Sequence, residues 1–171
     1  LNQGRRELTQ EVQAASTLAR DAQTFDIQLS LEDRQALSVF VTYGLSDVTR
    51  ALGMGERRAL VRDALETLGA DFPVTDLERM ARGIIPSTRN IIKERAQLPR
   101  VRKTFRTIYG HDPNFADLDE NLAWNTLMYR IRFSRDLVAE RKGIQAFRKA
   151  FGRSPSDPFQ WATVRVMGYV R

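Results

Sequence analysis

The chain has 171 residues, of which 42% are hydrophobic, and its formal net charge is +6 at pH 7. This length suits one ordinary globular core, and no apolar run approaches the roughly 18 residues that a membrane-spanning helix needs. There is no cysteine, which excludes disulfides, thiolate nucleophiles and zinc–thiolate sites.

A first helix is predicted from about Arg5 to Thr24, because apolar residues recur on one side at spacings of three and four. This stripe consists of Leu8, Val12, Ala15, Ala19 and Ala22. Because most of it is alanine, the helix buries little area by itself. We therefore expect residues 1–28 to form an N-terminal helical arm that leans on the remaining domain or on another subunit.

The next segment contains two helix signals. Ser30, with Asp33 three residues later, predicts a capped helix that ends at Gly44. Its buried stripe comprises Leu37, Phe40 and Val41. A short helix is predicted near residues 47–52, before Gly53.

Glycines also delimit the following two helices. A helix begins at Gly55 and ends at Gly69, with Leu60, Val61, Ala64, Leu65 and Leu68 directed inward. Thr75 with Glu78 predicts the cap of a short helix that Gly83 closes.

The C-terminal half begins with a basic helical segment, residues 88–109. Pro99 cannot donate a hydrogen bond inside a helix, so we expect two helical pieces that meet at a kink or break near Leu98. Asp117 with Glu120 predicts the start of a helix over about residues 118–132.

Two further helices complete the chain. Ser134 or Arg135 is expected to start a helix that ends at Gly152. Asp157 followed by Pro158 is a strong signal for a helix start, and that helix should run to the C-terminus.

One segment occurs twice: FRTIYGHDP from Phe105 matches FRKAFGRSP from Phe147, and a tryptophan follows each copy. A weaker third copy surrounds Gly69. These repeats and the absence of long period-two patterns predict an all-α fold. We expect a single helical domain, residues 29–171, of about three helix-corner-helix repeats at approximately 55–87, 88–133 and 134–171, preceded by the arm.

The corners themselves suggest local contacts. A glycine in the left-handed conformation ends each first helix, and a proline three residues later prevents the helix from restarting. The aromatic residue before the glycine, Tyr109 or Phe151, should then meet the tryptophan after the proline, Trp124 or Trp161. Both tryptophans are therefore expected to be largely buried.

Charge is distributed in blocks, with +6 over residues 88–111, −4 over 112–129 and +6 over 130–153. Two basic helices thus bracket an acidic loop. They offer one phosphate-facing surface, a solvated basic face, or a face that matches the acidic loop of a neighbouring copy. The candidate contact residues are Arg89, Lys93, Arg100, Lys103, Arg106, Arg130, Arg132, Arg135, Arg148 and Lys149.

No pattern of catalytic residues is evident. His111 is the only histidine and lies in a corner, which favours a surface turn residue. The acidic loop after it lacks the ligand spacing of a calcium loop, and Asp117 and Glu120 already serve as helix caps. The glycines around Gly53 do not follow a strand, which indicates a turn between helices. We expect no enzyme, no cofactor and no metal.

Two blocks of residues carry a family resemblance. Leu52, Gly53, Gly55, Glu56 and Arg57 form one, and Gly152, Arg153, Pro155, Trp161, Val164, Arg165 and Tyr169 form the other. They resemble uncharacterised helical surface or exported repeat proteins of ultra-small candidate-phyla-radiation bacteria. The resemblance covers about residues 40–171 and departs at Leu77, in place of a tryptophan, and at His111, in place of an arginine. It implies an envelope-associated helical module and no catalytic residues.

The function expected is that of a non-catalytic structural or adhesive module of the cell envelope or an extracellular assembly. Its partners would be further copies of itself or an envelope protein. The alternative is a nucleic-acid-binding protein that uses the arginine-rich helices. Leu1 in place of methionine favours a processed, extracellular or cell-surface protein, with a cytoplasmic location as the alternative.

Overall fold

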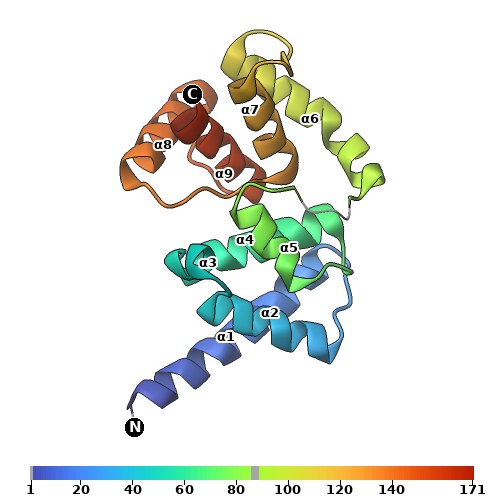
Figure 1. Ribbon diagram of the computed structural model, residues 1–171, viewed down its shortest axis with the longest axis vertical. Coiled ribbons are helices and arrows are strands. Elements are labelled where there is room, and N and C mark those ends of the chain that lie inside the picture. The colour runs from blue at the N-terminus through green and yellow to red at the C-terminus, as the bar shows by residue number, and fades with distance from the viewer. Residues whose placement is uncertain (1, 86–88) are drawn as a thin grey trace.

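The computed structural model describes residues 2–85 and 89–171, and these residues form nine α-helices, a C-terminal π-helix and no strand (Figure 1). The predicted all-α fold class is confirmed. The expected boundary between the first and second repeats, at residues 87–88, lies outside the described residues. So does Leu1, for which processing was expected.

Five helices form the N-terminal half: α1 (Asn2–Thr24), α2 (Leu31–Tyr43), α3 (Asp47–Ala51), α4 (Met54–Leu68) and α5 (Val74–Ala81). Their apolar sides form a first core cluster around residues such as Leu18, Phe40, Leu65 and Leu77. Residues Leu60, Val61, Ala64, Leu65 and Leu68 of α4 are all buried, as predicted.

Helix α1 packs on α2 and α4, so the arm leans on the domain as expected. The buried face was predicted only in part, however. Ala22 is buried as predicted, but the other buried residues are Ala14 and Leu18, while Leu8 and Val12 are exposed. The stripe chosen from the sequence lies about a quarter of a turn away from the side that meets α2 and α4. The first turns of α1 project beyond the rest of the molecule (Figure 1).

Most helix caps in this half agree with the sequence signals. The Ser30 hydroxyl accepts a hydrogen bond from the Asp33 backbone N–H, and Gly44 and Gly69 end α2 and α4. The cap predicted for α5 was wrong, because α5 begins after Pro73 with no side-chain cap.

The carboxylate of Glu78 instead supports helix α3. It accepts hydrogen bonds from the Ser46 backbone N–H and from the Ser46 and Thr49 hydroxyls. The packing of α5 against α3 brings these groups together across more than 25 residues of chain. A local capping motif is thus replaced by a long-range one.

The C-terminal half contains α6 (Ile91–Tyr109), α7 (Leu118–Tyr129), α8 (Leu137–Phe151), α9 (Pro158–Arg165) and the π-helix η1 (Val166–Val170). Its core cluster includes Val101, Phe105, Leu127 and Val166. Figure 1 shows this half above the first, with α6 and α7 on one side and α8 and α9 on the other.

Helix α6 continues through Pro99, so of the kink or break predicted near Leu98, the break was wrong. Val101, Phe105 and Ile108, all C-terminal to the proline, are buried against the second core. Burial of this apolar side outweighs the backbone hydrogen bond that proline removes.

The helix boundaries after α7 also differ from those expected. Arg130 takes the left-handed conformation (φ 55°, ψ 45°) and ends α7, three residues before the predicted limit. Helix α8 starts after Asp136, whose carboxylate accepts the Val138 and Ala139 backbone N–H groups, and not at Ser134 or Arg135. The start of α9 at Asp157-Pro158 is confirmed.

The two strong repeat corners are equivalent in detail. Gly110 and Gly152 both adopt the left-handed conformation that ends a helix. Arg106 reaches over its corner to Asp112, and Arg148 makes the same reach to Ser154. The corner at Gly69 has a different backbone conformation, with ψ −147°, so the weak third copy does not share this geometry.

The expected contacts of the tryptophans were wrong. Tyr109 stacks on Phe105 with 4.4 Å between ring centroids, and Trp124 meets the edge of Phe105 at 6.0 Å. Phe151 pairs with Phe147 instead of a tryptophan. Both tryptophans are only partly buried, because the two aromatic residues of each first helix already contact one another.

Candidate functional site at the junction of the two halves

The segment that follows α7 inserts two arginines between the halves of the molecule. Arg130 is completely buried, and its guanidinium lies 3.0 Å from Glu66 Oε1 and donates to the Thr67 hydroxyl at 3.0 Å. Its left-handed backbone turns the chain at this point. The side chain thereby ties the end of α7 to the side of α4.

Arg132 makes the second tie, with its Nη2 2.5 Å from Oδ2 of Asp63. Both side chains are buried. Burial raises the pKa of Asp63, while the positive charges of Arg132 and Arg130 act to lower it. Removal of both ions from water offsets much of their mutual attraction, so the pair adds little net stability, but loss of one partner alone leaves a buried unpaired charge.

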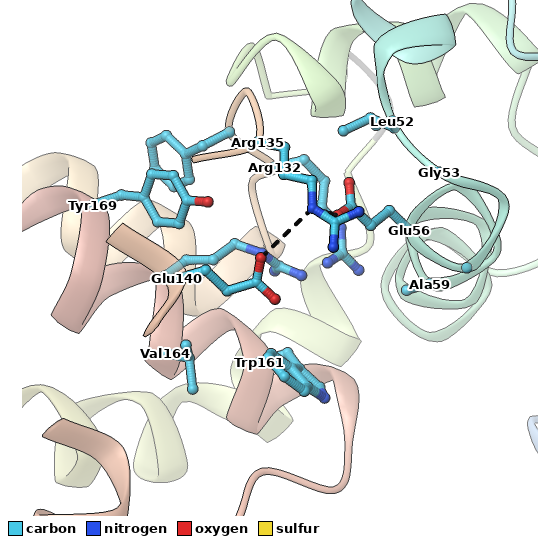
Figure 2. A pocket seen from close by; sticks show the side chains of 13 residues that line it. Leu52, Gly53, Glu56, Ala59, Arg132, Arg135, Glu140, Trp161, Val164 and Tyr169 are labelled. Atoms are coloured by element: carbon cyan, nitrogen blue, oxygen red, sulfur yellow. Dashed lines mark ion pairs between the residues drawn. The ribbon is translucent and has the colours of Figure 1, made fainter. Parts of the chain in front are cut away.

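A pocket of about 350 Å³ opens beside this pair (Figure 2). Helix α4 and the turn before it (Leu52 and Gly53) provide one wall, the segment after α7 a second, and α8, α9 and η1 a third. The lining residues are Leu52, Gly53, Gly55, Glu56, Ala59, Arg132, Phe133, Arg135, Glu140, Trp161, Val164, Arg165 and Tyr169.

Arg135 spans the two sides of the pocket. Its Nε lies 3.3 Å from Glu56 Oε1 on α4 and 3.8 Å from Glu140 Oε2 on α8, the pair marked by the dashed line in Figure 2. The side chain is about half exposed, so each of these ion pairs is weak by itself. Arg135 therefore forms a side of the pocket that solvent reaches.

The wall near Tyr169 is held by hydrogen bonds and stacking. The Tyr169 hydroxyl accepts from the Asp136 backbone N–H and donates to its carbonyl, both at 3.1 Å. The Tyr169 ring stacks on Phe133 with 5.3 Å between centroids. Burial raises the pKa of Tyr169, and its hydrogen bond to Asp136 acts in the opposite direction.

Among the arginines that line the pocket, Arg165 has no carboxylate partner in the described residues. It forms no ion pair within the described part of the chain, and its Nη1 is buried without a hydrogen-bond partner. The pocket therefore combines an unpaired guanidinium with indole, phenol and aliphatic surface. Such a set of groups is suited to binding a charged molecule that has an apolar part.

Two of the candidate contact residues predicted from the charge blocks do not lie on the surface. Arg130 and Arg132 are buried and paired with Glu66 and Asp63, so the prediction that they face phosphate is wrong. Their exposure was inferred from charge alone. Both arginines are buried because they pair with carboxylates of α4, which lie more than 60 residues earlier in the chain.

Several other candidate residues are engaged by carboxylates at the surface. Arg89 pairs with Glu94, Arg100 with Asp157, Arg106 with Asp112 and Arg135 with Glu56 and Glu140. The hydrogen bond from Arg106 lowers the pKa of Asp112.

The remaining candidates have no carboxylate partner in the described regions. Lys93 donates to the Leu65 carbonyl, and burial lowers its pKa. Arg148 donates to Ser154, and Lys103 and Lys149 are exposed. The ten residues therefore do not form one continuous cationic surface.

The acidic corner contains His111 at the surface, as predicted. Its Nε2 lies 3.4 Å from Glu120 Oε1, and its Nδ1 contacts the Asp112 carbonyl. Asp117 caps α7 as expected, while Glu120 accepts the Asn114 backbone N–H. Residues 2–85 and 89–171 contain no cluster of three metal-ligating side chains.

The sequence reasoning missed Asp63, Glu66 and the pocket beside them. A signal for Asp63 was present, because it falls on the inward face of α4 between Leu60 and Ala64. An acidic residue on a buried helix face requires a cationic partner. No local pattern indicated that Arg132 would supply it.

Comparison with known proteins shows no match to a family model, a curated protein or a solved structure. Over the described residues, no helix combines the length and the apolar character needed to cross a membrane.

Proposed function

We propose that this protein is a non-catalytic structural or adhesive module that associates with further copies of itself, end to end. One observation carries the proposal. The two ends of the molecule each present exposed apolar side chains, with carboxylates beside those of one end and two arginines beside those of the other.

One end is the projecting tip of α1. Leu8 is 64% exposed and Val12 is 69% exposed, and Arg5 and Arg6 are also exposed, with Glu7 and Glu11 on the same turns of the helix. The positive end of the helix dipole adds positive potential at this tip. A helix end that packs on nothing in its own chain is only marginally stable in water, so contact with another molecule would stabilise it.

The acidic end is the corner between α6 and α7. Phe115 is 54% exposed and Leu118 is 85% exposed, and the carboxylates of Asp117 and Asp119 lie beside them. Figure 1 shows this corner at the opposite end of the molecule from the N-terminus. Large apolar groups beside carboxylates match the apolar and arginine groups of the α1 tip.

Contact between two different surfaces of identical copies is heterologous, so it produces a ring or an open chain. Either arrangement suits a structural element of an extracellular or cell-surface assembly. That location is supported by the resemblance of the repeats to surface proteins.

Light scattering across a concentration series, at low and at high salt, tests the proposal. The weight-average mass should rise with concentration and should fall when salt screens the charged ends. Replacement of Leu8 and Val12 by glutamine should leave a monomer. The control is Val138→Gln, which removes an exposed apolar residue of α8 and should leave the association unchanged.

Charge reversal identifies the two surfaces. Replacement of Arg5 and Arg6 by glutamate should weaken association, as should Asp119→Lys alone. A mixture of these two variants should regain a heterodimer, because the reversed ends match one another. A protein that is monomeric at every concentration and salt, with no mass gained in the mixture, contradicts self-association.

Nucleic-acid binding is a second candidate, favoured by a shallow groove of about 560 Å³ on the outer side of α6. Arg102, Lys103 and Arg106 line it beside Leu98 and Pro99. Titration of labelled duplex and single-stranded DNA should then give an affinity that falls with salt, with a log-log slope near −5 for about six phosphate contacts. No binding at low salt contradicts this function.

A further inference from the structure

We propose that the pocket between the two halves binds a small organic monocarboxylate with an apolar or aromatic body. Arg165 receives the carboxylate, and the body of the ligand lies against Trp161. This site is separate from both ends of the molecule, so the inference stands independently of self-association.

The unsatisfied guanidinium of Arg165 is the first reason. Arg132 and Arg135, the other two cations of the pocket, are already paired with carboxylates. Arg165 makes no ion pair with a described residue, and its Nη1 is buried with no hydrogen-bond partner. A buried donor without a partner is destabilising, and more so on a charged group. A carboxylate is the acceptor that matches a guanidinium best.

A second unpaired donor belongs to another residue that lines the pocket. Arg132 is buried and lines the pocket, and its Nε has no hydrogen-bond partner although its Nη2 contacts Asp63. Two arginines from different segments of the chain therefore leave a guanidinium nitrogen unsatisfied in the walls of one pocket. Both nitrogens are therefore free to donate hydrogen bonds to an anionic group bound in the pocket.

The N-terminus of α4 adds to the positive potential. Gly53 is the N-cap and supplies no side-chain oxygen, and both Gly53 and Gly55 line the pocket. The first backbone N–H groups of this 15-residue helix thus lack a side-chain acceptor. Such a helix end attracts anions, in support of the arginine side chains.

The pocket carboxylates limit the charge of the ligand. Glu56 and Glu140 also lie in the lining, and they repel a group with two or more negative charges. Arg135 lies between both of them, and Arg165 is the pocket arginine with no carboxylate within ion-pair distance among the described residues. With Asp63 included, the three arginines and the three carboxylates balance, so the site accepts at most one added negative charge. A monoanion therefore fits, and inorganic phosphate or sulfate fits poorly.

The size and the apolar walls limit the body of the ligand. About 350 Å³ is at the small end of the range for organic ligand sites. Trp161 and Ala59 present apolar surface to the pocket, and Figure 2 shows Trp161 below and Ala59 to the right of the ion pair between Arg135 and Glu140. A planar ring or a short aliphatic chain is the body that this space accommodates.

Fluorescence titration of the Trp124→Phe variant tests the proposal, because Trp161 is then the only tryptophan. Phenylacetate is the probe, and its neutral isostere phenylacetamide and inorganic phosphate are the comparisons. We expect saturable quenching by phenylacetate, with an affinity at least about tenfold greater than that of the amide or of phosphate.

Two variants of the Trp124→Phe protein test whether Arg165 supplies the positive charge that binds the carboxylate. Arg165→Gln should weaken phenylacetate binding by roughly tenfold or more, to the level of the amide. The control Arg153→Gln removes an exposed arginine of the last corner and should bind as the parent does. Circular dichroism establishes that each variant is folded. If Arg165→Gln does not fold, the comparison of acid and amide on the parent protein decides.

Two peptides distinguish a free organic acid from the C-terminus of a peptide as the source of the carboxylate. A Gly-Gly-Phe tripeptide with a free C-terminus and its C-terminal amide are titrated in the same way. Binding of the free peptide alone, stronger than that of phenylacetate, assigns the site to a peptide C-terminus, and the reverse order assigns it to a free acid. Equal quenching by phenylacetate and its amide, or none by either ligand or peptide, overturns the proposal.

Discussion

Gly143 of α8 and Gly168 of the C-terminal π-helix lie in direct backbone contact. A Cβ atom placed on Gly168 would come within 3.1 Å of the Gly143 Cα and would overlap the Ala139 carbonyl oxygen. A Cβ on Gly143 would lie 3.0 Å from a methyl of Val164 and 3.2 Å from the Gly168 Cα. Only glycine at both positions permits this approach.

Alanine at either glycine should therefore destabilise the protein. We expect Gly143→Ala and Gly168→Ala each to reduce the free energy of unfolding by about 3 kcal/mol, at the upper end for overpacking. Urea unfolding followed by circular dichroism measures it. Gly55→Ala is the control, because a Cβ there meets no atom within 4 Å and helix propensity should make it neutral or slightly stabilising. Equal effects at all three positions would argue against the close packing.

Loss of the Asp63 carboxylate should be more damaging than loss of a surface acid. Asp63→Ala leaves the buried guanidinium of Arg132 without its counterion, so we expect a loss of about 3–5 kcal/mol in unfolding free energy. Asp71→Ala, at an exposed position, should change it by less than about 0.5 kcal/mol. The double variant Asp63→Leu with Arg132→Met should recover much of the loss. A double variant no more stable than Asp63→Ala would contradict this account.

Two aromatic residues, one from each strong corner, should differ in their contribution to stability. Phe105 is completely buried, so Phe105→Ala should cost about 3–5 kcal/mol. Trp161 is partly buried beside a pocket, and we expect about 1–2 kcal/mol for Trp161→Ala. Thermal and urea unfolding of the two variants check the order. A greater loss at Trp161 would indicate that the pocket is closed.

Tyr43 should ionise at unusually high pH. The hydrogen bond from its hydroxyl to Glu11 Oε1, 2.7 Å long, raises its pKa to about 12. Because the folded-state pKa exceeds the ordinary value of 10.0, the related stabilisation is complete below pH 10 and is lost as the pH rises towards 12. Difference absorbance between the parent and Tyr43→Phe gives this pKa. Glu11→Gln should lower it, and an unchanged pKa in that variant would exclude the hydrogen bond as the cause.

Helix termini and repeat corners were predictable from the sequence because their interactions are local. The caps at Ser30, Asp117 and Asp157 form between groups two or three residues apart. Gly110 and Gly152 end their helices in the conformation that glycine adopts most readily. For these features, a short stretch of chain contains every group that takes part.

The buried side of α1 and the continuity of α6 were decided by packing between helices. Leu8 and Val12 have the hydrophobicity of core residues, yet α2 and α4 meet α1 at Ala14 and Leu18. Likewise, Pro99 would end a helix in isolation, whereas burial of Phe105 and its neighbours keeps α6 intact. Periodicity reports that a helix has an apolar face but does not specify where its neighbours lie.

The amino-acid sequence by itself thus determined the all-α class, most helix boundaries and the two equivalent corners, since each depends on conformational preferences over a few residues. The tertiary structure alone decided which arginines are buried and which cation remains unpaired. Arg132 meets Asp63 across 69 residues of chain, while Arg165 lines a pocket whose walls come from both halves. Charges alike in sequence acquire different roles because burial and pairing depend on how distant helices meet.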